Sequence, residues 1–225
     1  MPTTDRTTIS RFLALSTPNV SDALDRLQID GAPQGIHALY ACSKIVGPAV
    51  TLKLVPASAA KESAVLGTLK AIKLGDPGAV LVIDSSENPH VNCYGGIGGY
   101  TTKHLGLTGC VADGVMRDID EYKSYGLPVY GKGIVQQSIR GRSSCGGYGI
   151  EVSIGKIRVN PGDIVMADES GVVIVPRDSI AQVLEHAELI KTTEDRVIAS
   201  IRAGMDPVEA HEKVNYDSML KLVTK

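Results

Sequence analysis

The sequence predicts an α/β fold with a mixed, partly parallel sheet and a long C-terminal helix. Two continuous apolar runs of strand length, over residues 79–84 and 107–112, alternate with segments whose apolar residues recur at helical spacing. This alternation is typical of strands that are joined by crossover helices. From about residue 179 to residue 202 the apolar residues keep to one side, which predicts the long terminal helix.

The elements of the first half lie between clear start and stop signals. Thr17 is a suitable helix cap and Pro18 suits the first helical position, so we expect a helix to begin there. The other expected elements are a strand over residues 45–55 that is interrupted at Gly47-Pro48, a helix over 61–74, and a strand over 79–84 that is buried on both faces.

Glycines divide the second half into shorter elements. The glycine-rich run at residues 94–100 is expected to form a loop before a short helix over 101–105. The remaining expected elements are a strand over 107–112, a helix over 119–125, extended chain over 127–130, short strands between 150 and 175, the helix from 179 to 202, and an amphipathic piece with Met219, Leu220, Leu222 and Val223. We expect a single domain over residues 1–225, with a core of about 10–178 and a C-terminal helical extension of about 179–225.

The composition argues against several classes of protein. Hydrophobic residues make up 43% of the 225 residues, enough for a packed core, and a net charge of −2 disfavours nucleic acid or an anionic membrane as the main partner. No apolar run approaches the roughly 18–20 residues of a membrane span, and the N-terminus lacks the apolar core of a signal peptide, so we expect a cytoplasmic protein. The four cysteines are scattered and are expected to be buried thiols rather than disulfides or metal ligands.

The strongest candidate for a functional site is the pair Arg117-Asp118. It follows the strand over 107–112 and the tight turn Asp113-Gly114, and ligands of open α/β sheets gather beyond the carboxyl ends of strands. A guanidinium suits bidentate binding of a carboxylate, and a single aspartate can hold Mg²⁺ together with several waters. Adjacent Arg-Asp pairs are also common on solvated surfaces, so the position after the strand is the observation that favours a site.

The glycine run upstream offers backbone N–H groups to the same ligand. Residues 95–99 read Gly-Gly-Ile-Gly-Gly, and a glycine-rich turn before a helix points unhindered N–H groups at an anion. A flexible loop or a close backbone crossing is the alternative interpretation. The run matches neither the dinucleotide-binding motif nor a P-loop, so it does not predict a nucleotide cofactor.

Other polar residues carry weaker signals. None of the five histidines shows the spacing of a zinc site, and His90, just before the glycine run, is the one of most interest. Asp84, at the end of a strand, could support a site or cap the next turn. The segment 141–147, with Arg140 and Arg142 nearby, could bind phosphate, but a mobile surface loop is the better interpretation.

Taken in order, the motifs resemble the family of the regulator of ribonuclease activity A and the class II 4-hydroxy-4-methyl-2-oxoglutarate aldolases. The resemblance covers about residues 10–205. The motifs that carry it are residues 17–24, 47–51, 75–84, 113–118 (Asp-Gly-Val-Met-Arg-Asp), 126–129, 161–163 and 167–176.

This resemblance implies a β/β/α swivelling-domain fold that assembles as a homotrimer or homohexamer, with the active site between subunits. It implies that Arg117 binds the pyruvyl carboxylate and keto oxygen and that Asp118 ligates Mg²⁺ or Mn²⁺. The backbone amides that would hold the substrate are those of Gly96, Ile97, Gly98 and Gly99.

Carboxylates elsewhere in the chain complete the implied site, with one departure. A carboxylate from the C-terminal helix of a neighbouring subunit would orient a metal-bound water, and Glu194 is the best match, with Asp195 and Glu188 as alternatives. Many aldolases of the family carry an acidic residue about 21 positions before the arginine, where this chain has Gly96. The change should weaken the hold on the cation, alter the proton relay or admit a different substrate.

The leading hypothesis is a divalent-metal-dependent lyase that cleaves or decarboxylates a 2-oxo acid through a pyruvate enolate. Its reaction would be of the 4-hydroxy-2-oxo acid aldolase or oxaloacetate decarboxylase type, with Arg117, Asp118 and Glu194 as catalytic residues. One alternative is a non-catalytic binding protein that regulates a ribonuclease, and another is a diverged lyase or isomerase on another small carboxylic acid. The expected partners are a small anionic oxo acid and further copies of the chain.

Overall fold

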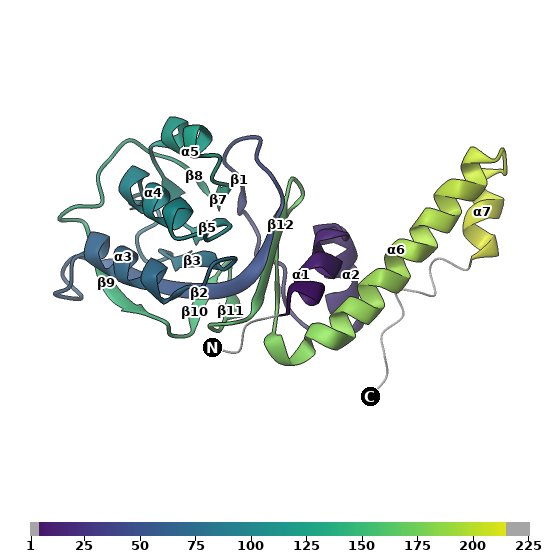
Figure 1. Ribbon diagram of the computed structural model, residues 1–225, viewed down its shortest axis with the longest axis horizontal. Coiled ribbons are helices and arrows are strands. Elements are labelled where there is room, and N and C mark those ends of the chain that lie inside the picture. The colour runs from purple at the N-terminus through teal and green to yellow at the C-terminus, as the bar shows by residue number, and fades with distance from the viewer. Residues whose placement is uncertain (1–4, 215–225) are drawn as a thin grey trace.

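The computed structural model, which describes residues 5–214, is built around the long strand β2 (Ile45–Pro56; Figure 1). The first residues of β2 pair antiparallel with β12 (Ile164–Asp168), and later residues pair in parallel with β3 (Val80–Asp84) and antiparallel with β9 (Ser143–Tyr148). The predicted interruption at Gly47-Pro48 is wrong, because the strand continues through it. Pro48 is the last residue to pair with β12 and Ala49 the first to pair with β3, so the proline lies where the strand changes neighbours.

The main sheet is mixed and partly parallel, as predicted. Its order is β1-β7-β5-β3-β2-β12-β13, with β9 as a further partner of β2. Neighbouring pairs from β2 to β7 are parallel, and β1, β12 and β13 are antiparallel to their neighbours. Because β1 also contacts β13, the sheet curls nearly into a barrel. Four of these strands are short: β1 (His37–Ala38), β5 (Gly109–Asp113), β7 (Val129–Gly131) and β13 (Gly171–Val175).

The remaining strands of residues 5–214 form two small sheets. One is parallel and consists of β4 (Asn92–Tyr94), β6 (Val115–Met116) and β8 (Gly133–Ile134). The other is the hairpin of β10 (Val152–Ile154) and β11 (Ile157–Val159).

Helices cover the sheet in two groups (Figure 1). One group consists of α3 (Ala64–Leu74), α4 (Gly96–His104) and α5 (Ile119–Tyr125). The other, beside β12 and β13, consists of α1 (Arg6–Leu13), α2 (Thr17–Arg26) and α6 (Ile180–Arg202). A 3-10 turn (Arg177–Ser179) precedes α6, and α7 (Pro207–Lys213) packs against its end.

Strand β3 is buried on both faces, as its apolar sequence predicts. Leu81 and Ile83 belong to the core beneath α3 and α5, whereas Val80 and Val82 belong to the core that β10, β12 and β13 enclose. This alternation is the period of two that a β-strand imposes on its side chains.

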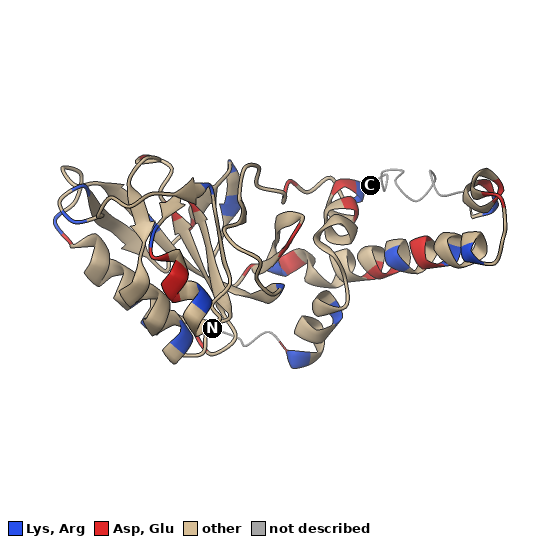
Figure 2. Ribbon diagram, turned by 90° about the horizontal axis from the view of Figure 1, so that it is seen from above, with Lys and Arg blue, Asp and Glu red and all other residues tan. Residues whose placement is uncertain are grey.

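The long C-terminal helix is confirmed as α6. Its buried residues, from Val183 to Thr193, lie in its first two thirds, and the last turns extend away from the sheet (Figure 1). Figure 2 shows basic and acidic residues interspersed along this helix. No helix among residues 5–214 is long and apolar enough to cross a membrane. The predicted piece around Met219 lies outside the described residues.

Two predicted loops are regular structure instead. Helix α4 begins at Gly96, so the glycine run forms its first turns and is not a loop before residue 101. Residues 143–148 form β9, and Cys145 is buried there, so the prediction of a mobile surface loop over 141–147 is wrong. Pairing with β2 outweighs the weak strand preference of the Ser and Gly residues in this segment.

Helix starts differ from the predictions by a few residues. Ser16, not Thr17, caps α2 and forms a capping box with Asn19, whereas the Thr17 hydroxyl donates to Asp168. Helix α3 begins at residue 64 instead of 61, and α1 carries no signal that we recognised in the sequence. The four cysteines are free thiols, as expected, and three of them are buried.

A buried aspartate holds the hairpin β10–β11 to the ends of the parallel strands. Asp84 accepts hydrogen bonds from the Ser86 hydroxyl and the Ser153 N–H, and its carboxylate lies 2.9 Å from Lys53 Nζ. Burial alone would raise the pKa of Asp84, but the hydrogen bonds from Ser86 and the contact with Lys53 outweigh burial and lower it. The carboxylate therefore stabilises the fold in its ionised form.

We expect Asp84→Asn to lower the free energy of unfolding by about 2 kcal/mol at neutral pH. The variant removes the buried, hydrogen-bonded negative charge that lies beside the Lys53 ammonium group. A lowered pKa contributes stability above the pKa of the unfolded chain, and this stability is lost as the pH falls through the folded pKa. The difference in unfolding free energy between wild type and variant, measured by urea unfolding, should therefore become smaller from pH 7 to about pH 3. An equal difference at both pH values would contradict the role given to this carboxylate.

Candidate active site

The two motifs singled out in the sequence follow two paired strands. Strands β4 and β6 are parallel, with Tyr94 opposite Met116, so their carboxyl ends lie side by side. Gly95 follows β4 and caps α4, and Arg117 follows β6. The Arg117 N–H donates to the Tyr94 carbonyl over 3.2 Å, which joins the two turns.

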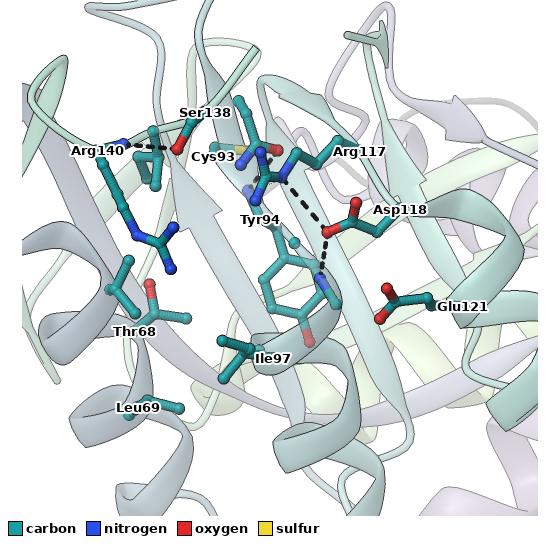
Figure 3. Close-up of a pocket in the computed structure, with 16 residues that line it drawn as sticks. Thr68, Leu69, Cys93, Tyr94, Ile97, Arg117, Asp118, Glu121, Ser138 and Arg140 are labelled. Carbon is teal, nitrogen blue, oxygen red and sulfur yellow. Dashed lines mark hydrogen bonds and ion pairs between the residues drawn. The ribbon is translucent and has the colours of Figure 1, made fainter. Parts of the chain in front are cut away.

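A cavity of about 270 Å³ lies over these turns (Figure 3). The first turn of α4 and the Arg117-Asp118 turn form part of its wall, and α3 and residues 138–140 form much of the rest. A volume of this size suits a small metabolite.

Asp118 is turned away from its own helix. It caps α5 in the left-handed conformation (φ 61°, ψ 37°) and makes no side-chain capping bond there. Its Oδ2 atom accepts instead from the N–H of Gly96, at the start of α4, over 2.7 Å. The other oxygen, Oδ1, accepts no hydrogen bond from the described residues, so it is available to a ligand.

Arg117 carries an unused donor in the same cavity. Its Nε atom lies 3.4 Å from Oδ2 of Asp118, close enough for an ion pair. The buried Nε–H nevertheless has no hydrogen-bond acceptor among the described residues. Because a buried donor without an acceptor is costly, this group is suited to binding an anion that enters the cavity.

Of the four backbone amides predicted to hold a substrate, two are free to do so. The N–H of Gly96 donates to Asp118, and the N–H of Gly99 donates to the Gly95 carbonyl over 3.0 Å. Ile97 and Gly98 line the cavity, and their N–H groups have no acceptor among residues 5–214. N–H groups in the first turn of a helix carry its partial positive charge, which favours an anion.

Glu121 is a charged residue of the cavity that was missed in the sequence, whereas Arg140 was considered there only as a possible phosphate-binding residue beside the segment 141–147. Glu121, in the first turn of α5, lies beside the start of α4, and Arg140 points into the cavity from the opposite wall (Figure 3). Glu121 could have been found from its spacing, because it lies one helical turn after Arg117 and Asp118. Arg140 has no spacing of this kind, and its nearness to the segment 141–147 was the one signal for it in the sequence.

Asp84 and His90 do not line this cavity. Asp84 caps the turn after β3, the second of the two roles considered for it, through hydrogen bonds from the N–H and hydroxyl of Ser86. His90 is exposed.

Glu194 lies on α6, away from the cavity of its own chain. It accepts from the Asn19 side chain over 2.7 Å. Of the alternatives, Glu188 pairs with Arg11 and Asp195 pairs with Lys191. The predicted role of Glu194 concerns the cavity of a neighbouring subunit, so it stays a prediction.

The donor set suits Mg²⁺ or Mn²⁺. Asp118 offers one carboxylate oxygen, Oδ1, that accepts no hydrogen bond from residues 5–214. Among the described residues no group of three or more His, Cys, Asp or Glu side chains comes together. One or two carboxylates, with waters and substrate oxygens, form the usual environment of Mg²⁺.

Known proteins share both the sequence pattern and the fold. The profile of the RraA-like family, described as Aldolase/RraA, matches residues 17–174. Protein DlpA of Legionella pneumophila is 29% identical over 209 residues, or 93% of this chain, and the chain spans 34% of that protein's length. A protein of Halalkalibacterium halodurans named "Putative 4-hydroxy-4-methyl-2-oxoglutarate aldolase" is 30% identical over 215 residues, covering 93% of this chain and 96% of that protein.

A solved structure is similar to this chain in its fold. RraAS2 of Streptomyces coelicolor, described as an unusual member of the RNase ES inhibitor RraA protein family, superposes with a TM-score of 0.78 at 25% identity. The match covers 87% of this chain and 97% of that chain.

We expect Asp118→Asn to weaken Mn²⁺ binding at least about tenfold, because it removes the charge and one oxygen from the cavity. Asparagine tolerates the left-handed conformation that residue 118 adopts, so the backbone should stay in place. Titration of Mn²⁺ by calorimetry or electron paramagnetic resonance measures the effect. The matched control is Asp120→Asn on the same helix, where the side chain is 97% exposed. Equal affinities of wild type and Asp118→Asn would exclude Asp118 as a ligand.

Proposed function

This chain belongs to the Aldolase/RraA family, and on that premise we propose that it is a divalent-metal-dependent lyase that cleaves or decarboxylates small 2-oxo acids. The observation that carries the proposal is the convergence of Arg117, Asp118 and the first turn of α4 on one cavity. The name of the H. halodurans relative supports an aldolase reaction.

The cavity is suited to an anionic substrate. Within the described part of the chain, the buried Nε–H of Arg117 has no acceptor, and neither have the N–H groups of Ile97 and Gly98, which line the same cavity. These donors can bind the carboxylate and the 2-keto oxygen of an oxo acid. Arg140, across the cavity, supplies a second positive charge and favours a substrate with a second acid group (Figure 3).

The negative charge that develops on the substrate during cleavage would lie beside the same N–H donors. Breaking the C3–C4 bond of a 4-hydroxy-2-oxo acid, or losing CO₂ from oxaloacetate, leaves the enolate of pyruvate. Asp118 would hold Mg²⁺ or Mn²⁺, which polarises the 2-keto group when bound. Arg117 would stabilise the negative enolate oxygen in a partly buried setting, where such contacts are stronger than in water.

The proposal extends to an assembly of three or six copies in the cytoplasm, with Glu194 of one copy reaching the cavity of another. Leu189, Ile198 and Ile201 are exposed on α6, by 48%, 46% and 39%, which supports packing of this helix against another chain. Sedimentation or light scattering would measure the number of copies.

A second candidate function is regulation of a ribonuclease by binding. The likeness to RraAS2, which is described with RNase ES inhibitors, supports it. A pull-down with a purified ribonuclease of the RNase E type separates the candidates. A regulator should bind that ribonuclease whether or not Arg117 is intact, whereas the lyase needs Arg117 for turnover.

Wild-type protein with Mg²⁺ or Mn²⁺ should release pyruvate from a 4-hydroxy-2-oxo acid or from oxaloacetate. We expect Arg117→Ala to lower kcat/KM roughly 10- to 150-fold, the equivalent of about 1.5–3 kcal/mol for hydrogen bonds to a charged group. A coupled assay for pyruvate measures the loss, and circular dichroism checks that the fold is kept. Arg158→Ala, on an exposed site of β11, is the control. Unchanged turnover of Arg117→Ala would exclude this cavity as the active site.

A further inference from the structure

The charged side chains of Arg117, Asp118 and Glu121 lie against two consecutive glycines at the start of α4. A Cβ atom on Gly95 would lie 3.0 Å from Asp118 Oδ2 and 3.3 Å from Arg117 Nε. A Cβ atom on Gly96 would lie 1.8 Å from Glu121 Oε2, well inside van der Waals contact. The Glu121 carboxylate therefore occupies the space where a side chain of residue 96 would begin.

Glu121 is held in this position from α5. The Tyr125 hydroxyl, one turn later, donates to Glu121 Oε2 over 3.0 Å. The Tyr125 ring in turn meets the ring of Tyr100 on α4 edge-on, with centroids 5.6 Å apart. The carboxylate thus lies between the two helices on the wall of the cavity (Figure 3).

Few other side chains of the cavity can accept a proton. Asp118 Oδ2 already accepts from Gly96 and lies beside Arg117, and Oδ1 is the oxygen assigned above to the divalent cation. Burial raises the pKa of the Cys93 thiol to about 12 and raises the pKa of Tyr94 well above its ordinary value, so both groups stay protonated at neutral pH. Among residues 5–214, the Glu121 carboxylate forms no ion pair with Arg117 and accepts one hydrogen bond, from Tyr125.

We propose that Glu121 is a further catalytic residue of this site, the base that takes the proton of the substrate's 4-hydroxyl group, with Tyr125 as its positioning residue. This inference rests on the lyase function proposed above. It also gives a reason for glycine at residue 96, because any side chain there would displace the carboxylate.

The step balances without a further reactant. The hydroxyl O–H bond breaks and its proton moves to the Glu121 carboxylate, while the electron pair left on oxygen forms the new carbonyl at C4. The C3–C4 bond breaks, and its electron pair passes into the enolate of pyruvate. Glu121 then returns the proton to C3, which yields pyruvate and restores the carboxylate.

Two substrates separate this role from a merely structural one. Cleavage of a 4-hydroxy-2-oxo acid needs a base, whereas oxaloacetate loses CO₂ from a carboxylate that is already ionised. We expect Glu121→Gln to lower kcat for aldol cleavage about 100-fold or more. Decarboxylation of oxaloacetate should change less than about threefold, and the dissociation constant for Mn²⁺ should be unchanged.

Matched variants sharpen the test. Gly96→Ala should reproduce the selective loss, because its Cβ must push the flexible Glu121 side chain aside while the fold is kept. Tyr125→Phe should give a smaller loss of the same selectivity. Asp120→Asn, an exposed carboxylate on the same helix, should leave both activities unchanged.

The remaining outcomes would each overturn the inference. Equal losses of both activities with weaker Mn²⁺ binding would make Glu121 a metal ligand, and no loss of either activity would give it no role in the reaction. If the wild type released pyruvate from neither substrate, the proposed lyase function would fail. An active wild type with an unchanged ratio of the two activities in Glu121→Gln would refute this inference alone.

Discussion

The hydrogen bond from the Gly96 N–H to the Asp118 carboxylate is the contact on which the site depends. It joins the first turn of α4 to the cap of α5, two residues that lie 22 positions apart in the sequence. Asp118 makes this bond instead of capping its own helix through its side chain, and its backbone is left-handed. In return, one carboxylate oxygen is fixed by the protein and the other faces the cavity.

The parallel strands beneath this contact bring its two residues close together. Because β4 and β6 are neighbours, the turn that follows each of them emerges at the same edge. The glycines at 95 and 96 then allow the two turns to approach closely without side chains between them. A cation, a carboxylate and the positive end of a helix thus share one small space, a combination suited to a substrate that is itself charged.

Periodicity was enough to predict the buried strand β3 and helix α6, and the position of Arg117-Asp118 after a strand was enough to single out a pair that lines the cavity. The glycine run was misjudged because glycine disfavours helix in isolation, yet packing beside Tyr94 and Tyr122 makes residues 96–104 helical. The fit between Gly96 and Glu121 is a relation of shape between two helices, and Arg140 enters by the course of the chain after β8. The spacing of Glu121 from Asp118 could indicate that both lie on one face of a helix, but no periodic pattern indicates the fit with Gly96 or the position of Arg140.

Strand β2 has a consequence for how the molecule comes apart. It is hydrogen-bonded to β3, β9 and β12, and its side chains contribute to all three hydrophobic cores. A partial opening that released β2 would expose all three hydrophobic cores at once. The loss of buried apolar surface would outweigh the gain in chain entropy, so such an intermediate would be high in free energy. Protection against amide exchange should accordingly reach its highest values along β2, and the sheet should behave as one cooperative unit rather than as separable lobes.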